Sequence, residues 1–420
     1  MQTLKRTVGV PAGVAITVGA VLGTGVLVLP ALTADQAGPA ALVAWALMGL
    51  MSLVFAVTFA RLAVAVPDAG GIAAYVRTAF GRPLGFASGN LLIATVPLGG
   101  PVAAMIGALY AVELFALPAA VAPLIAAVLL FASLALNYRG ITLSARTQMI
   151  AIFSIGALIL IALVAASPHV DLARLAPFAP HGWAAVGVDF VLLFWAFVGW
   201  EMTVHLVEEF TDPERDMVRV MAWSVLVVDL VYLALAWVTV GTGAYLGRGH
   251  TVALAVLMGV GLGRLGFDLA GVLAVLLSFA TTHAYITGFS RLVYAQARRG
   301  EMPAYLAALH PRFSTPAAVL LSLGGSFAVF LALIVLWHLS LETLILIPSS
   351  VFVLLYVGAM AAALRLLRRS VDRALAAVGC LVALSALFFT GFAILYPAVV
   401  VVVSLGLYRT VAKAQPEGGL

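Results

Sequence analysis

The chain has very little charge for its length. Only 9% of its 420 residues are Asp, Glu, Lys or Arg, whereas 64% are hydrophobic. A soluble globular domain is usually about one quarter charged, so too few charged side chains are present to cover a water-facing surface. No long polar stretch separates the apolar runs. These absences exclude the soluble classes of protein and predict an all-α polytopic membrane protein, a single domain over residues 1–420 within the lipid bilayer.

Cysteine and catalytic motifs are scarce as well. The one cysteine, Cys380, lies in an apolar run and cannot form an intrachain disulfide. The spacings typical of zinc sites, zinc proteases and serine hydrolases do not occur. The net charge of +5 would suggest nucleic acid in a soluble protein, but the basic residues here lie in short loops. We therefore expect no enzyme, no nucleic-acid partner, no cofactor and no metal.

Apolar runs are numerous enough for twelve membrane-spanning helices, since each crossing needs about 20 residues. The predicted spans are residues 8–34, 38–66, 85–115, 119–136, 146–166, 184–209, 217–246, 266–296, 316–337, 341–366, 372–389 and 391–409. Residues 248–264 are expected to form a loop helix. With a cytoplasmic N-terminus, 19 of the 22 basic residues fall inside and only Arg174, Arg248 and Arg264 fall outside. This bias is what the positive-inside rule requires, so both termini are predicted to be cytoplasmic.

Two of the twelve spans are interrupted at mid-membrane depth. The first carries glycines at positions 19, 23 and 25, and the sixth carries Gly199 directly before Trp200 and Glu201. Glycine weakens a helix, and backbone freed in a membrane is tolerated only where it lines a cavity or is buried in protein. Interruptions at matching positions of two halves, here five spans apart, indicate a transporter binding site. The alternative is that these glycines only permit close helix packing.

Four stretches carry a resemblance to a known family. They are Gly23-Thr24-Gly25 with Pro30, residues 67–81, residues 197–216 and residues 291–316. In this order they resemble the first helix, the first cytoplasmic loop, the sixth helix with its following loop, and the loop after the eighth helix of the amino acid–polyamine–organocation transporter superfamily. Within it, the chain is similar to bacterial exporters of L-methionine and branched-chain amino acids.

The resemblance implies a LeuT-like fold of two five-helix inverted repeats, at about 8–166 and 184–366, with additional helices at about 372–409. It implies a secondary active transporter in a bacterial inner membrane, acting as a monomer or homodimer. Its substrates would be methionine, leucine, isoleucine and valine, moved by alternating access, with efflux coupled to protons. An importer or exchanger, or a transport-inactive amino acid sensor on the same fold, remains the alternative.

An amino acid substrate brings a carboxylate and an ammonium, and both must be satisfied when they leave water. Freed backbone can supply both partners. The N–H groups of Thr24 and Gly25 would face the carboxylate, because they begin a half-helix with its positive dipole end. The carbonyls of Val21, Trp195 and Val198 would face the ammonium. The predicted substrate-binding residues are Val21, Gly23, Thr24, Gly25, Trp195, Phe197, Val198, Gly199 and Trp200.

An apolar substrate side chain needs an apolar pocket. Trp195, Phe197 and Trp200, with Pro97 and Leu98 of the third span, could line it, although aromatic residues in membrane helices often serve only packing. These residues are the basis for expecting neutral rather than charged amino acids.

Few ionisable residues lie at membrane depth, and such residues are functional candidates. Glu201 and His205, one turn apart, are the candidates for proton coupling and gating, and a purely structural Glu201 is the equal alternative. Superfamily members that couple through a lysine carry it in the fifth helix, and residues 146–166 contain none. Asp189, Asp229 and His283 are further intramembrane candidates without an assigned role.

Overall fold

The computed structural model describes residues 9–68, 70–141, 145–204, 207, 210, 212–247, 249–298, 300 and 302–414. These residues form helices joined by turns and short 3-10 segments, with no β-strand among them. The helices are α1 Val10–Val21, α2 Gly25–Ala37, α3 Ala41–Ala65, α4 Ile72–Phe80, α5 Arg82–Leu114, α6 Ala122–Tyr138, α7 Ala145–Ala166, α8 Trp183–Phe197, α9 Trp200–Thr203, α10 Pro213–Thr242, α11 Gly249–Arg298, α12 Ala317–Trp337, α13 Leu341–Leu366, α14 Ser370–Ala386 and α15 Leu395–Ala414.

Most of these helices are apolar along their whole length. Within the described part of the chain, nine stretches are long and apolar enough to cross a membrane. One of these stretches, Gly25–Ala65, contains both α2 and α3. Three further apolar stretches are shorter, namely Val10–Val21, Phe153–His169 and Trp183–Phe197. The prediction of an all-α, multi-pass membrane protein is therefore confirmed.

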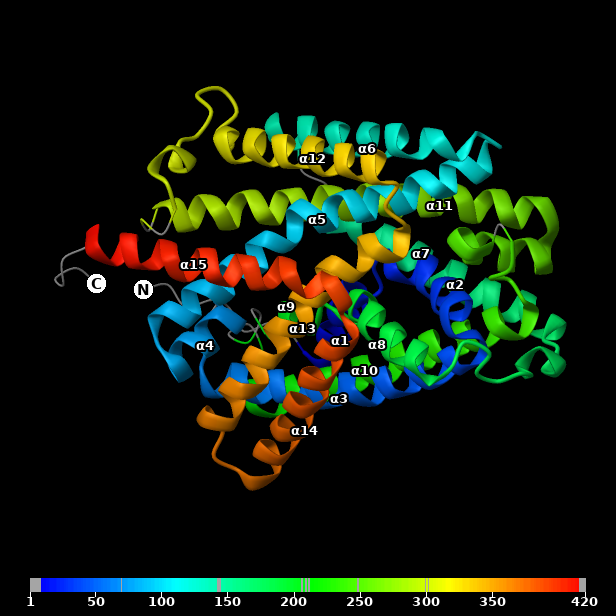
Figure 1. Ribbon diagram of the computed structural model, residues 1–420, viewed down its shortest axis with the longest axis horizontal. Coiled ribbons are helices and arrows are strands. Elements are labelled where there is room, and N and C mark those ends of the chain that lie inside the picture. Colours follow the sequence, from blue (N-terminus) through cyan, green and yellow to red (C-terminus); the bar gives the residue numbers. More distant parts are fainter. Residues whose placement is uncertain are drawn as a thin grey trace.

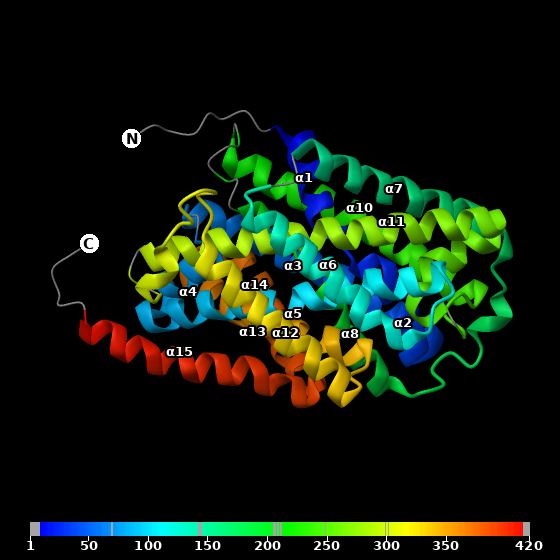
Figure 2. The ribbon, with the colours of Figure 1, turned by 90° about the horizontal axis from the view of Figure 1, so that it is seen from above.

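The long helices form a bundle around the short ones. In Figure 1, α5 and α11 run side by side, with α6 and α12 beside them at one edge, and α3 and α10 pack together on the opposite side. The short helices α1, α8 and α9 lie near the middle of this view. Figure 2 shows α4 and the C-terminal end of α15 at one end of the molecule and α2 towards the other. The core between these helices is made of buried apolar side chains.

Several predicted boundaries coincide with breaks in the backbone. The predicted loop helix at 248–264 and the span that follows it are both part of α11, which is kinked at Gly263, where φ is +63°. The predicted boundary between the last two spans, at residues 389–391, also coincides with a break in the helix. Gly391 has φ +54° there, between α14 and α15. Both kinks use a left-handed φ that glycine adopts without a steric penalty.

Charged residues gather where α4 and the ends of the long helices meet. Asp68 accepts a hydrogen bond from the Arg77 guanidinium at 2.8 Å. Arg365 of α13 donates to the Ala79 carbonyl at the end of α4. Arg61 of α3 lies 3.5 Å from Asp372 of α14. These contacts hold α4 and α14 against the bundle at the same end, away from the middle of the membrane helices.

Candidate functional site at two helix breaks

The first break separates α1 from α2. Leu22 has φ −72° and ψ 67°, and the Gly23 N–H donates to the Val21 carbonyl at 2.7 Å, so the chain makes an inverse γ-turn directly after α1. The helix resumes at Gly25. The first N–H groups of a helix have no acceptor within it, so those at the start of α2 are available to a ligand.

The second break separates α8 from α9 and has a different cause. Val198 is extended, and Gly199 has φ +136° and ψ −20°, a conformation that favours glycine. In a continuous helix the Gly199 N–H would donate to the Trp195 carbonyl. Instead it donates to Oε2 of Glu201 at 3.1 Å. The Glu201 carboxyl thus stabilises the break and leaves the Trp195 carbonyl without its helical donor.

The two breaks lie against each other. A Cβ added at Gly25 would lie 3.0 Å from the Ala196 Cα and 3.2 Å from Cδ1 of Trp195. A Cβ added at Gly199 would lie 3.0 Å from Cγ2 of Val21. Such distances leave no room for a side chain, so glycine is needed at both places for close approach. The two interruptions predicted from the sequence are therefore brought into direct contact.

A tyrosine from α10 joins the ends of the two interrupted helices. The Tyr232 hydroxyl lies 3.1 Å from the Val21 carbonyl and 3.2 Å from the Ala196 carbonyl. One hydroxyl proton is shared between these two acceptors, which are at the C-terminal ends of α1 and α8. A second link lies further along, where the Thr17 and Thr203 hydroxyl oxygens are 3.0 Å apart. Because Thr17 donates to the Gly13 carbonyl, Thr203 is the donor in this pair.

Glu201 is held from a second side by α13. The Tyr356 hydroxyl donates to the same Oε2 atom at 2.9 Å. The ring of Tyr356 packs edge-on against Phe55, Phe59 and Phe194. Glu201 is 5% exposed. One of its carboxyl oxygens therefore accepts two hydrogen bonds in a buried environment that is otherwise aromatic. His205, the second residue predicted for coupling, lies outside the described residues.

The predicted backbone ligands differ in what they already bind. The Val21 carbonyl accepts from both Gly23 and Tyr232. Gly23 itself is half-buried, and an added Cβ would meet only the Val21 oxygen, at 3.9 Å. The buried Thr24 hydroxyl has no hydrogen-bond partner among the described residues. Free space at the first break therefore lies at Gly23 rather than at Gly25.

The three predicted aromatic residues occupy different surroundings. Trp195 reaches α5, since its Cη2 lies 3.3 Å from a Cβ added at Gly99, one residue after Leu98. Phe197 packs instead against Trp45 and Tyr232. Trp200 is fully buried, and its indole N–H has no acceptor in the described part of the chain.

Trp195 has a neighbour that the sequence did not single out. Tyr285 of α11 lies within 3.9 Å of the same added Cβ at Gly99. It is 37% exposed, although it belongs to the middle of a long apolar helix. One turn along, Gly288 has no atom within 4 Å of an added Cβ. Trp195 therefore lies close to a partly exposed tyrosine of α11.

The ends of the interrupted helices give this place an uneven charge distribution. The C-termini of α1 and α8 bring partial negative charge to the Tyr232 hydroxyl, and the start of α2 brings partial positive charge next to them. A molecule with a cationic and an anionic group close together matches this arrangement. An α-amino acid has both on one carbon.

The remaining intramembrane candidates, Asp229 and His283, form hydrogen bonds between neighbouring helices. Asp229 accepts a hydrogen bond from the Ser52 hydroxyl at 3.3 Å, between α10 and α3. Nδ1 of His283 lies 3.1 Å from the Asn137 amide nitrogen, and the Thr287 hydroxyl donates to the same amide at 2.6 Å, between α11 and α6. Both networks join neighbouring helices. Asp189 differs from them, since its carboxyl has no hydrogen-bond partner among the described residues.

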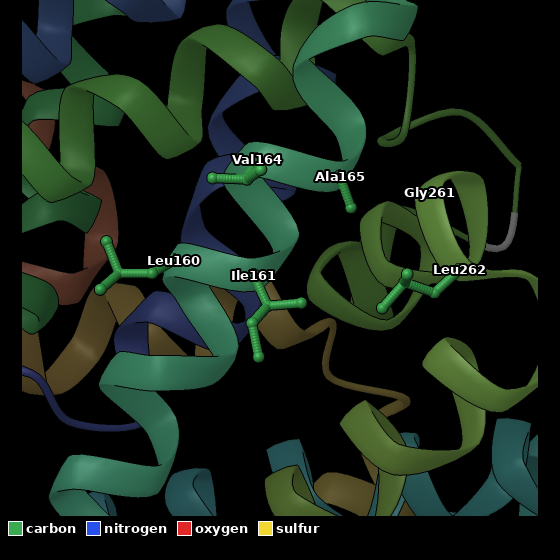
Figure 3. Close-up of a pocket in the computed structure, with 6 residues that line it drawn as sticks. All are labelled: Leu160, Ile161, Val164, Ala165, Gly261 and Leu262. Atoms are coloured by element: carbon green, nitrogen blue, oxygen red, sulfur yellow. The ribbon is translucent and has the colours of Figure 1, made fainter.

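A surface hollow of about 500 Å³ also lies elsewhere. It is formed by Leu160, Ile161, Val164 and Ala165 of α7 with Gly261 and Leu262 of α11, as Figure 3 shows. Its lining is apolar, and Val164 is 75% exposed. A hollow without polar groups on an exposed apolar face is suited to lipid chains and offers nothing to a charged substrate.

Comparison with known proteins identifies the family of this chain. The amino acid permease family model matches residues 9–411. An amino acid permease of Bacillus subtilis strain 168, YecA, is 40% identical over 400 residues, covering 95% of this chain and 94% of its own. The L-methionine/branched-chain amino acid exporter YjeH of Escherichia coli K12 is 31% identical over 433 residues, covering 100% of both.

A solved structure supports the fold. The manganese transporter of Eremococcus coleocola superposes with a TM-score of 0.59 over 97% of this chain and 96% of its own, at 14% identity. At this identity the likeness concerns the fold alone. The family match and the two bacterial relatives span nearly the whole chain, and they agree with the motifs at residues 23–30 and 197–216. This chain belongs to the amino acid permease family and is a multi-pass membrane transport protein.

Proposed function

We propose that the chain is a secondary transporter of neutral, apolar amino acids, with methionine, leucine, isoleucine and valine as substrates. The observation that carries the proposal is the meeting of two interrupted helices, which brings two helix C-termini and one N-terminus together. The exporter and permease relatives support the substrate class, since YjeH is an exporter of methionine and branched-chain amino acids.

The substrate is placed by its backbone groups. Its carboxylate lies at the start of α2, next to the N–H groups of Thr24 and Gly25. Its ammonium lies at the end of α8, where the Trp195 carbonyl has lost its helical donor to Glu201. Its side chain lies beside the Trp195 ring. Gly23 supplies the open space through which these groups are reached.

The proposed topology has twelve crossings in a 5+5 inverted repeat with two additional helices. In it, α1 with α2 forms the first crossing and α8 with α9 forms part of the sixth. The short lengths of α1 and α8 support this pairing, because neither could cross a membrane alone. Both termini are cytoplasmic in this arrangement, in a bacterial inner membrane. Alternating access then follows from rocking the helices that carry the breaks against the rest of the bundle.

Glu201 is proposed to couple efflux to protons. Its carboxyl accepts hydrogen bonds from Gly199 at the break and from Tyr356 of α13. Any movement between α9 and α13 changes the number of donors, and with it the proton affinity of the carboxyl. A group whose proton affinity differs between two conformations is what coupling requires.

The test is flux of radiolabelled methionine and leucine in proteoliposomes, measured in both directions with and without a pH gradient. If efflux is coupled to protons, an imposed pH gradient should make the substrate accumulate on the side of the vesicle membrane that corresponds to the outside of the cell. Exchange without gradient-driven flux would identify an exchanger, and flux with the opposite sign an importer. Binding without any flux would identify a sensor and refute transport.

A further inference from the structure

Asp189 is the buried acidic residue that the proposed mechanism leaves unused. It lies in the middle of α8 and is 0% exposed. Neither of its carboxyl oxygens has a hydrogen-bond partner among the described residues. Glu201, by contrast, accepts two hydrogen bonds. An ionised carboxylate buried without a donor is far more costly than a neutral acid, so this position favours a bound proton.

The charged neighbours of Asp189 are also acidic. Glu342, at the start of α13, is close enough to interact electrostatically with Asp189, and Asp35, near the end of α2, interacts in turn with Glu342. The nearby His181 imidazole is held at 3.0 Å from the Gln36 carbonyl. A second negative charge nearby adds to the cost of ionising Asp189.

The other helices that pack against α8 supply no counter-ion at this level. On α3 the one ionisable side chain is Arg61, which pairs with Asp372 of α14 at the opposite end of the bundle. The other ionisable residues of α14 are Arg373, beside that pair, and Cys380. Within the described chain, Asp189 therefore faces only acidic partners.

Exposure falls in steps from the surface to Asp189. Asp35 is exposed, Glu342 is half-buried and Asp189 is buried. The three thus form a series from the exposed end of the bundle that carries the end of α2, visible opposite α4 in Figure 2, to the buried carboxyl of α8. Under the proposed topology this end is the outer face of the membrane.

A polar stripe on α13 continues from this cluster to the break. Glu342, Ser349 and Tyr356 are spaced seven residues apart, so they lie on one face of the helix, with about 10 Å between successive members. Ser349 is fully buried, and its hydroxyl has no partner in the described residues. Tyr356 donates to Glu201. The unsatisfied groups therefore lie between the outer acidic cluster and the Glu201 carboxyl.

We propose that Asp189, with Glu342 beside it, is a second proton-binding site, placed between the outer surface and Glu201. A proton arrives from water past Asp35, binds a carboxylate oxygen of Asp189 and is released from it again, to water or onward to Glu201, so no other reactant is consumed. Binding of the proton rests on the burial of Asp189 and its lack of a donor. The role of this second site in transport rests on the proposed function, in which protons from the outer side would bind Asp189 before they reach Glu201.

Infrared difference spectroscopy on the full-length protein in lipid nanodiscs tests proton binding without any transport. A band from a protonated carboxyl is expected near neutral pH in the wild type and should be lost in Asp189→Asn. Asp268→Asn is the control, because Asp268 of α11 has a counter-ion, Arg264, at 2.8 Å. It should leave that band in place. Persistence of the band in Asp189→Asn would overturn the proposal and leave the proposed transport function intact.

Glu342→Gln gives a second arm should Asp189→Asn fail to fold. Removing the neighbouring charge should shift the pH at which the Asp189 band titrates, and an unshifted titration would overturn the pairing. Flux assays then address the role. Asp189→Asn should retain amino acid exchange but lose the response of net flux to pH on the outer side, between about pH 5 and 8. An unchanged response would refute the role of Asp189 in proton coupling, even if transport itself is confirmed.

Discussion

Gly25→Ala is predicted to weaken the contact between the two breaks, even though alanine favours a helix more than glycine does. The added Cβ would lie 3.0 Å from the Ala196 Cα and 3.1 Å from its Cβ. A backbone atom cannot swing aside as a flexible side chain does, so α2 and α8 must separate by a few tenths of an ångström. Overpacking of this kind costs about 1–3 kcal/mol. That range corresponds to about 5- to 150-fold in the equilibrium between packed and separated helices.

Thermal unfolding of the purified protein, with and without methionine, measures this effect. Gly25→Ala should unfold at lower temperature and bind methionine more weakly, and Gly25→Leu should not bind it. Gly325→Ala on α12 is the matched control, since an added Cβ there meets nothing within 4 Å. Gly23→Ala should leave unfolding of the free protein unchanged and weaken binding only. Wild-type stability and affinity in Gly25→Ala would refute the close packing of the breaks.

Three further substitutions test the rest of the site. Trp195→Ala should weaken methionine and leucine binding by about tenfold or more, since lost apolar contacts in a pocket are worth roughly 1–3 kcal/mol. Trp223 of α10 is 57% exposed, so the control variant Trp223→Ala should leave the affinity for both amino acids unchanged. Competition assays measure both affinities. Tyr232→Phe should lower the free energy of unfolding by about 1 kcal/mol, because one shared hydrogen bond is lost. Chemical denaturation measures this difference, and an unchanged midpoint would contradict the role of Tyr232 in joining α1 and α8. Glu201→Gln keeps acceptors for both of its donors, so exchange should continue while flux driven by a pH gradient disappears; equal loss of both modes would indicate a structural role.

The helix breaks were predictable because their cause is local. Glycine at position 199 is readable from the sequence, and φ +136° there is a conformation that other residues rarely adopt. The neighbouring acid at position 201 is also local, since its carboxyl reaches back two residues to the Gly199 N–H. Interactions that span two or three residues depend on few variables, so residue type and spacing suffice to identify them.

The partners of the breaks were not predictable, because they come from distant helices. Tyr232 and Tyr356 appear in the sequence as single tyrosines in apolar runs, a pattern shared by other tyrosines such as Tyr110. Only packing brings their hydroxyl groups to Val21, Ala196 and Glu201. A tyrosine buried in a membrane helix needs an acceptor for its hydroxyl, which is the one signal that could have marked them.

The differing positions of the three predicted aromatic residues have a related cause. Within a continuous helix, residues 195, 197 and 200 would have directions set by the helical period. The extended Val198 and the left-handed Gly199 interrupt the helical period between residues 197 and 200, so the direction of Trp200 no longer follows from that of Phe197. Trp195 therefore faces α5, while Trp200 is enclosed in the core. Where a break resets the helical phase, sequence spacing no longer predicts which face a side chain occupies.

Two carboxyl groups in this bundle illustrate how environment divides roles between identical chemical groups. Glu201 has two donors, a backbone N–H and a tyrosine hydroxyl, which offset part of the cost of burying its charge in the conformation described. Asp189 has acidic neighbours and no donor, so its neutral form is favoured. A proton passing from Asp189 to Glu201 would thus move from a carboxyl without donors to one whose two donors disfavour protonation. It would do so only after the donors of Glu201 had moved away, as a relative motion of α9 and α13 would achieve. Proton transfer between the two sites would then be tied to the conformational change, which is the condition for coupled rather than leaky transport.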